Sequence, residues 1–289
     1  MKKKRSNRRN NNRGQKTPWS TTLLAIAAII AVLYGAKLLN ARQNDYRETA
    51  AGEWDVTAML HPVTNPAVKE TIVEYDAMTV SFNPELHIPN WVSWELLGTE
   101  TMGNEERSDK FITDTNVAGC ATTNDYRGSG YDRGHIAPAA DMRWSRSAMQ
   151  QSFMMTNIAP QLHSLNGGAW KKLEEKCRVW AQADSAIIII AGPITADPID
   201  EYIGETQVAV PKRFFKIIAS PWANPPRGIG FIMPNGKVKG GMQAAAVSID
   251  EVEAATGHDF FSQLPDSIEQ LIESECRFNY WSNLKPQNK

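Results

Sequence analysis

The chain has 289 residues, of which 31 are basic and 32 are acidic, so its formal net charge is −1. With 42% hydrophobic and 22% charged residues it is not a disordered protein, and three cysteines are too few for a disulfide-stabilised scaffold. The net charge hides an asymmetry: residues 1–40 hold nine basic residues and no acidic one, which leaves 22 basic against 32 acidic residues in 41–289. A basic tail therefore precedes an acidic body, which is long enough for one large domain or two small ones.

Residues 1–39 are expected to direct the chain to a membrane. Residues 1–18 form a basic tail without hydrophobic periodicity, and no charge falls between Trp19 and Ala36. The apolar stretch 19–39 spans about 30 Å as a helix, which is roughly one hydrocarbon core. We therefore predict a single-pass anchor in the inner (cytoplasmic) membrane, with the basic N-terminus in the cytoplasm and the body periplasmic or extracellular. A cleaved signal peptide is the alternative, although Ala36-Lys37-Leu38 is a poor cleavage site.

The remaining chain is expected to contain a linker at 40–65, a folded domain at 66–276 and a C-terminal tail at 277–289. Hydrophobic patterns predict strands at 71–75, 78–82, 91–97, 187–192, 213–218 and 228–233, the first two as a hairpin. Helices are expected at 145–154, 167–182, 248–256 and 264–274. Ser248 begins a capping-box pattern with Glu251. Strands dominate without a βαβ rhythm, which favours an α+β fold around a central antiparallel sheet.

Two stretches concentrate residues with catalytic chemistry. The first runs from Asp125 to Pro138 and places Asp132, Arg133 and His135 on a strand-like segment after two glycine-containing turns. A histidine near an aspartate is more often an ordinary surface pair than a catalyst. This stretch alone therefore leaves both interpretations open.

The second stretch, 156–178, repeats functional residue types every four positions: Asn166, Trp170, Glu174 and Arg178. Residues at i and i+4 share one face of a helix, and Asn166 lies where a helix would begin. Asn166 and Glu174 are about 12 Å apart along such a helix, so both cannot ligate one small cation directly. The spacing suits Mg²⁺, which keeps most of its waters and takes few protein ligands. An amphipathic surface helix with a plain asparagine cap is the alternative.

Taken together, Asp132-Arg133-Gly134-His135, Asn157, Gln161, Asn166, Trp170, Glu174 and Arg178 resemble the DNA/RNA non-specific endonuclease family of the ββα-metal (His-Me finger) superfamily. The resemblance covers roughly residues 70–270. It implies a ββα-metal active-site motif and Mg²⁺-dependent hydrolysis of phosphodiester bonds in DNA and RNA, with Mn²⁺ as a possible substitute. The partners implied are DNA and RNA, besides the membrane contacted by 19–39. A homodimer is left open.

The resemblance also implies roles for individual residues. His135 is the general base, and Asn166 is the sole direct protein ligand of the metal. Glu174 holds a metal-bound water, and Arg178 contacts phosphate. Three further catalytic candidates have supporting roles: Asp132 orients waters, Arg133 clamps backbone or phosphate, and Asn157 orients the phosphate or His135.

Substrate binding by an acidic body requires a local basic groove, and Arg127, Arg143 and Lys171 are its main candidates. One departure from the family concerns Cys120, which occupies a position where several relatives carry an arginine. Two outcomes are open: the turnover is lower, or Arg127 or another basic group supplies the charge. An inactive nucleic-acid-binding protein, and a phosphodiesterase for another phosphoester, are the alternative functions. Among the cysteines we expect a disulfide between Cys177 and Cys276.

Overall fold

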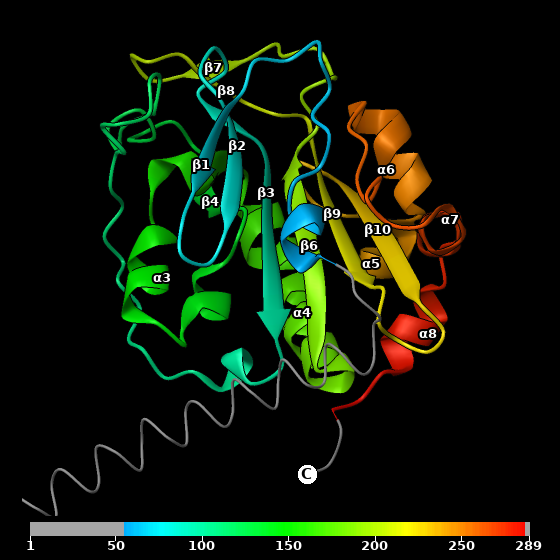
Figure 1. Ribbon diagram of the computed structural model, residues 1–289. Coiled ribbons are helices and arrows are strands. Elements are labelled where there is room, and N and C mark those ends of the chain that lie inside the picture. Colours follow the sequence, from blue (N-terminus) through cyan, green and yellow to red (C-terminus); the bar gives the residue numbers. More distant parts are fainter. Residues whose placement is uncertain (1–54, 287–289) are drawn as a thin grey trace, which may run out of the picture. The chain divides into compact units, whose positions relative to one another are not determined.

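The computed structural model describes residues 55–286, and its centre is a seven-stranded antiparallel sheet in the order β1-β2-β3-β6-β9-β10-β11 (Figure 1). The strands are β1 (Thr71–Glu74), β2 (Thr79–Asn83), β3 (Ile88–Leu97), β6 (Ala186–Pro193), β9 (Arg213–Ser220), β10 (Arg227–Pro234) and β11 (Ala246–Val247). Two small antiparallel pairs lie outside this sheet. They are β4 (Asp132–His135) with β5 (Ile158–Gln161), and β7 (Tyr202–Ile203) with β8 (Val208–Ala209).

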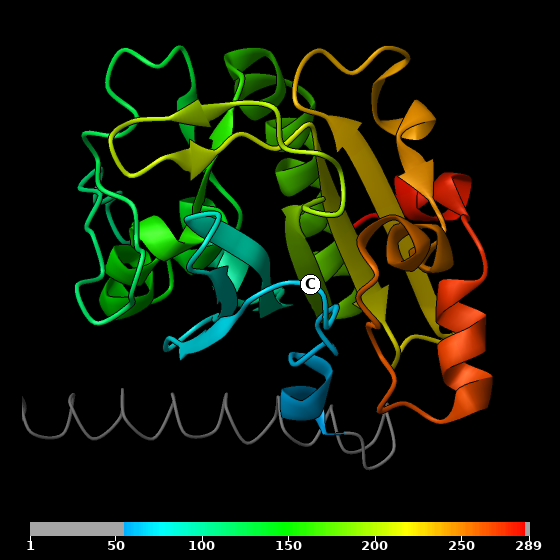
Figure 2. The same ribbon diagram turned by 90° about the horizontal axis from the view of Figure 1, so that it is seen from above.

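The helices cover both faces of the sheet (Figure 2). The α-helices are α2 (Val56–Met59), α3 (Arg146–Gln151), α4 (Lys171–Asp184), α5 (Gly241–Ala244), α6 (Ile249–Thr256), α7 (Asp266–Glu273) and α8 (Phe278–Asn283). Short turns of other helix types are η1 (Glu100–Met102), η2 (Ala139–Met142), η3 (Met155–Asn157) and η4 (Leu165–Trp170).

Strand β10 shows why the two helical layers lie on opposite faces. Trp180 of α4 stacks on Phe231, with ring centroids 6.3 Å apart. At the neighbouring Gly230, an added Cβ would lie 2.7 Å from Val252 of α6. Successive residues of a strand face opposite sides, so α4 and α6 cover opposite faces of β10. Glycine at this position permits the close approach of α6.

The predicted α+β fold with a central antiparallel sheet is confirmed, and each predicted strand and helix has an observed counterpart. The hairpin pairs Thr71 with Phe82, and the fully buried β6 lies between β3 and β9. The capping box at Ser248 and Glu251 is present as predicted. Both faces of β6 are covered, so nearly all of its residues are apolar. This uninterrupted apolar run made the strand recognisable in the sequence.

The domain limits observed differ from those expected. The part of the predicted linker from residue 55 onward contains α2, and Val63 forms a β-bridge with Asp259. The expected C-terminal tail contains α8, whose Trp281 is completely buried. Single residues such as Trp281 carry no periodic signal, so nothing in the local pattern indicates that these segments join the core.

The cysteine prediction was wrong. The described residues include all three cysteines, and all three are free. Cys177 is buried on α4, whereas Cys276 is exposed after α7. The predicted tail 1–18 and anchor 19–39 lie outside residues 55–286. Within that range, no helix has both the length and the apolar character needed to cross a membrane.

Candidate active site

The two sequence stretches form one local unit, in which β4 pairs with β5 and the chain then enters η4 and α4. His135 lies opposite Ile158, and Asp132 lies opposite Gln161. Gly134 is required at the centre of β4, because an added Cβ would lie 2.3 Å from the Gln161 side chain. The turn η4 has π-helical hydrogen bonding and carries Asn166, which brings this residue beside β4. This is the ββα arrangement that the family resemblance implied.

His135 lies in an aromatic pocket. Its ring centroid is 5.3 Å from that of Phe111 and 4.8 Å from that of Phe153. Burial, aided by the positive charge of Arg107, lowers the pKa of His135 to about 3. The imidazole is therefore neutral near pH 7, as a general base must be.

Asp132 organises the entrance to α4. Its Oδ2 accepts a hydrogen bond of 2.8 Å from Nδ2 of Asn166 and lies 2.8 Å from Nδ1 of His163. This contact fixes the Asn166 amide so that Oδ1 remains as a free acceptor within the described part of the chain. His163, which the sequence analysis did not single out, is exposed but belongs to this group through Asp132.

A buried charged cluster lies beside α4, which contributes Glu174 and Arg178 to it. Arg178 Nη1 donates to Asp141 Oδ1 at 2.9 Å, and Asp141 is only 1% exposed. Glu174 lies close enough to Asp141, Arg178 and Lys216 to interact with their charges. Burial raises the pKa of Glu174 to about 7, and the positive charge of Lys216 opposes that rise. Arg178, predicted to contact phosphate, is therefore held by a buried carboxylate, with its side chain 21% exposed.

Lys216 completes this cluster and is itself completely buried. Its Nζ donates to the carbonyl oxygen of Ile136 at 3.3 Å. The ammonium also lies 4.8 Å from the ring centroid of Trp94 and 4.4 Å from that of Trp170. Such contacts stabilise a desolvated cation. Lys216 thereby connects the central sheet to the residue that follows His135.

Asn157 and Arg133 point into the protein. Asn157 is completely buried, and its amide binds the backbone of Ala137 at both N and O and the carbonyl of Ser152. Arg133 donates to the carbonyl of Thr123 at 2.9 Å, and its guanidinium lies 5.3 Å from the Phe111 ring centroid. Both therefore hold backbone around β4, whereas the sequence analysis left a phosphate contact open for each.

The three substrate-binding candidates Arg127, Arg143 and Lys171 are exposed, and the structure shows no contact among them. Arg127 lines an open cavity of about 710 Å³ between residues 122–129 and 201–206. That cavity also contains Asp125, Glu201 and Glu205, so its lining carries both charges.

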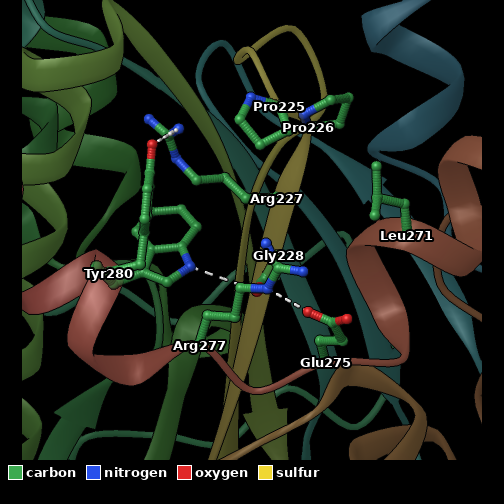
Figure 3. A pocket seen from close by; sticks show the side chains of 9 residues that line it. Pro225, Pro226, Arg227, Gly228, Leu271, Glu275, Arg277 and Tyr280 are labelled. Atoms are coloured by element: carbon green, nitrogen blue, oxygen red, sulfur yellow. Dashed lines mark hydrogen bonds and ion pairs between the residues drawn. The ribbon is translucent and has the colours of Figure 1, made fainter.

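A second cavity, of about 20 Å³, lies beside Arg227 and Tyr280 and has no residue of the ββα unit in its lining (Figure 3).

Sequence reasoning missed Arg107, Asp141 and Lys216. Lys216 did carry a signal, because a single lysine interrupts an otherwise apolar predicted strand. Arg107 lies 4.9 Å from the ring centroid of Phe153, the same ring that packs against His135. Cys120 instead accepts a hydrogen bond from the backbone of Asp114. Arg107 therefore places a positive charge near His135, whereas the thiol of Cys120 carries none.

The residue types of the ββα unit fit a hard divalent cation. Asn166 offers a neutral oxygen fixed by Asp132, and Glu174 offers a carboxylate on the same helical segment. Gln161 of β5 is fully buried, and neither its Oε1 nor its Nε2 has a partner within residues 55–286. Oxygen donors without sulfur or paired histidines are typical of Mg²⁺ sites rather than zinc sites.

Comparison with known proteins finds nucleases among the relatives of this chain. A nuclease of Nostoc sp. is 31% identical over 271 residues, covering 87% of this chain and 97% of that protein. The mitochondrial nuclease EXOG of Xenopus laevis is 32% identical over 208 residues, covering 66% of this chain and 58% of the relative. The chain thus spans little more than half the length of that mitochondrial relative.

A solved structure of EndoG in complex with EndoGI matches 72% of this chain and 92% of the EndoG chain, with 26% identity and a TM-score of 0.66. The sequence pattern of the DNA/RNA non-specific endonuclease family matches residues 56–267, which is most of the chain and includes the whole ββα unit. The chain therefore belongs to the DNA/RNA non-specific endonuclease family and is a phosphodiester hydrolase.

Proposed function

We propose that this protein is a Mg²⁺-dependent endonuclease that cleaves both DNA and RNA, with His135 as general base and Asn166 as the metal ligand. The observation that carries the proposal is the hydrogen bond from Asn166 Nδ2 to Asp132, which leaves Asn166 Oδ1 free on the ββα unit that also carries His135. The relatives named nuclease, EXOG and endonuclease G support the reaction class.

Different side chains can carry out the different proton transfers of the hydrolysis. Nε2 of His135 is buried, so Nδ1 is the ring nitrogen left to take a proton from an attacking water. Phe111 and Phe153 restrict the ring, which keeps this nitrogen in one direction. Glu174, with a pKa near 7, is suited to pass a proton toward the leaving oxygen. When bound, the cation would neutralise charge on the phosphate and the leaving group.

The test uses the full-length chain, purified in detergent because of its apolar residues 19–36. Supercoiled plasmid and RNA are incubated with Mg²⁺ or with EDTA. The variants are His135→Ala and Asn166→Ala, with the partly exposed His61→Ala and the exposed Asn116→Ala as matched controls. We expect cleavage of both substrates with Mg²⁺, a loss of about 10²–10⁴-fold in His135→Ala, and no loss in either control.

Each failure has a specific meaning. Undiminished cleavage by His135→Ala would remove His135 from the role of base. Cleavage in EDTA would exclude metal dependence. Turnover of a small phosphodiester with intact plasmid would indicate a different substrate. Cleavage of only DNA or only RNA would show that the enzyme distinguishes between the two sugars.

We also propose that residues 19–39 anchor the enzyme in the inner membrane, with the nuclease domain on the opposite side from the basic N-terminus. The basis is the uncharged stretch from Trp19 to Ala36 after eight basic residues. In cells, the protein should stay in membranes after alkaline extraction, and externally added protease should release the domain from spheroplasts. Recovery of the full-length chain in the soluble fraction would refute the anchor.

A further inference from the structure

A cluster of carboxylates lies between α6 and α7, away from the ββα unit. Asp250 and Glu253 belong to α6, and Glu273 belongs to α7. One carboxylate oxygen from each of these three residues lies within 4.8 Å of the others. Figure 1 shows α6 and α7 side by side at the edge of the molecule, and both helices contact β10.

Glu273 is the unusual member of this cluster. It is only 6% exposed, and its buried Oε1 has no hydrogen-bond partner within residues 55–286. A buried, unsatisfied carboxylate oxygen is costly, because it has left water without gaining a replacement interaction. The buried carboxylate of Asp141, by contrast, accepts a hydrogen bond from Arg178.

The charged groups that shift the pKa of Glu273 are all acidic. Burial and the carboxylates of Glu253, Glu269, Asp250 and Asp259 raise the pKa of Glu273 to about 9. None of these five residues forms an ion pair in the described part of the chain. Glu253 is positioned by a hydrogen bond of 2.8 Å from the backbone N–H of Phe260 to Oε1. The cluster therefore has at least one oxygen held in place and no basic partner within the described residues.

We propose that Asp250, Glu253 and Glu273 form a second, structural cation site that binds Ca²⁺ and joins α6 to α7. Three carboxylates supply only oxygen ligands, which suit a hard divalent cation. Ca²⁺ accepts flexible geometry and mono- or bidentate carboxylates, whereas Mg²⁺ requires a near-ideal octahedron. A bound cation would give the buried Oε1 its missing partner and cancel the repulsion between the two helices. This site is independent of the nuclease mechanism.

The binding experiment separates this site from the active site. Full-length protein in detergent is stripped with EDTA, dialysed and titrated with Ca²⁺ at equilibrium. The Asn166→Ala background removes the proposed active-site ligand. In that background we expect about one Ca²⁺ per chain, and none when Glu273→Gln is added. Glu275→Gln is the matched control, because Glu275 lies two residues beyond Glu273 and pairs with Arg277 outside the cluster (Figure 3).

Thermal unfolding gives a second, direct readout. At a Ca²⁺ concentration about 100 times Kd, the Tm of the Asn166→Ala protein should rise by about 5–10 °C. Glu273→Gln and Asp250→Asn should abolish this rise, while Glu275→Gln should retain it. Glutamine also replaces a repelling carboxylate, so Glu273→Gln without Ca²⁺ should be at least as stable as its parent. Nuclease activity with Mg²⁺ should stay at the level of the parent in Glu273→Gln made on the wild-type chain.

Two results would overturn the proposal. Equal Ca²⁺ binding by the Asn166→Ala protein with and without Glu273→Gln would show that the cluster is not the site. Absence of both Ca²⁺ binding and the Tm rise in Asn166→Ala would show that Glu273 is a buried, protonated acid that needs no cation.

Discussion

Replacing Asn157 with alanine separates a structural role from a catalytic one. The buried amide makes three hydrogen bonds, of 2.9, 2.9 and 2.8 Å, to the backbone of Ala137 and Ser152. Alanine leaves three buried backbone groups without partners. Each lost bond costs roughly 1 kcal/mol and the small cavity adds to this, so the free energy of unfolding should fall by about 3–4 kcal/mol. For a domain of this size, Tm should decrease by roughly 6–16 °C.

The same substitution should reduce catalysis through geometry. Ala137 lies two residues after His135, so loosening its backbone would displace the side chain that we propose as the general base. We expect kcat to fall by about 10- to 100-fold at temperatures where the variant remains folded. Urea denaturation and steady-state cleavage of a short duplex measure the two effects separately.

Asn90→Ala is the matched control. Asn90 is also completely buried, and its amide makes three hydrogen bonds, to Lys69, Ser81 and Asn83. It lies in β3, outside the ββα unit. A similar loss of stability with unchanged kcat is expected. If Asn157→Ala keeps the wild-type Tm but loses activity, the side chain acts on the phosphate and the structural argument is wrong.

Three further predictions concern charges. Arg107→Ala should lower kcat at least about tenfold, because it removes the positive charge that lies over the Phe153 ring beside His135; unchanged kcat would show that catalysis does not need this charge. Lys216→Met should lower kcat about tenfold by releasing the carbonyl of Ile136. It should also lower the free energy of unfolding by about 3–5 kcal/mol, because the buried carboxylates of Asp141 and Glu174 lose a nearby cation; wild-type stability with normal kcat would contradict this. Burial lowers the pKa of His258 to about 4, below its unfolded value of 6.5, so the unfolded state binds more protons and stability is lost as pH falls between these values. This loss of stability amounts to about 3 kcal/mol. Urea titrations at pH 7 and pH 4 should show that His258→Asn lacks this loss. If the variant keeps the wild-type pH dependence, His258 is not the source of the loss.

The acidic cluster adds to the charge asymmetry of the chain. An acidic body that binds nucleic acid must keep its negative groups away from the substrate, since phosphates and carboxylates repel each other. The three carboxylates of the cluster, Asp250, Glu253 and Glu273, lie together between α6 and α7. Arg107, Arg127 and Lys171 lie on segments that precede or form the ββα unit. Electrostatic attraction of the substrate should therefore depend on where these basic side chains lie, and it should weaken with added salt.

Local patterns in the sequence were sufficient for much of the secondary structure. The run Ile187 to Ile190 indicated a strand buried on both faces, and Ser248 with Glu251 marked the start of α6. These signals depend on neighbours within a few residues, so they survive without knowledge of the fold. The short strands β4 and β5 carry no comparable alternation, and only their pairing defines them.

For the site, the sequence by itself determined the order and spacing of His135, Asn166 and Glu174, and with them the reaction class. Only the tertiary structure decided which groups surround them. Lys216 reaches a carbonyl 80 residues away, and Arg178 pairs with Asp141 from 37 residues away. Burial, pKa and the availability of a side chain for substrate depend on such distant contacts. No periodicity or local motif encodes them, because they arise only when the sheet and α4 pack together.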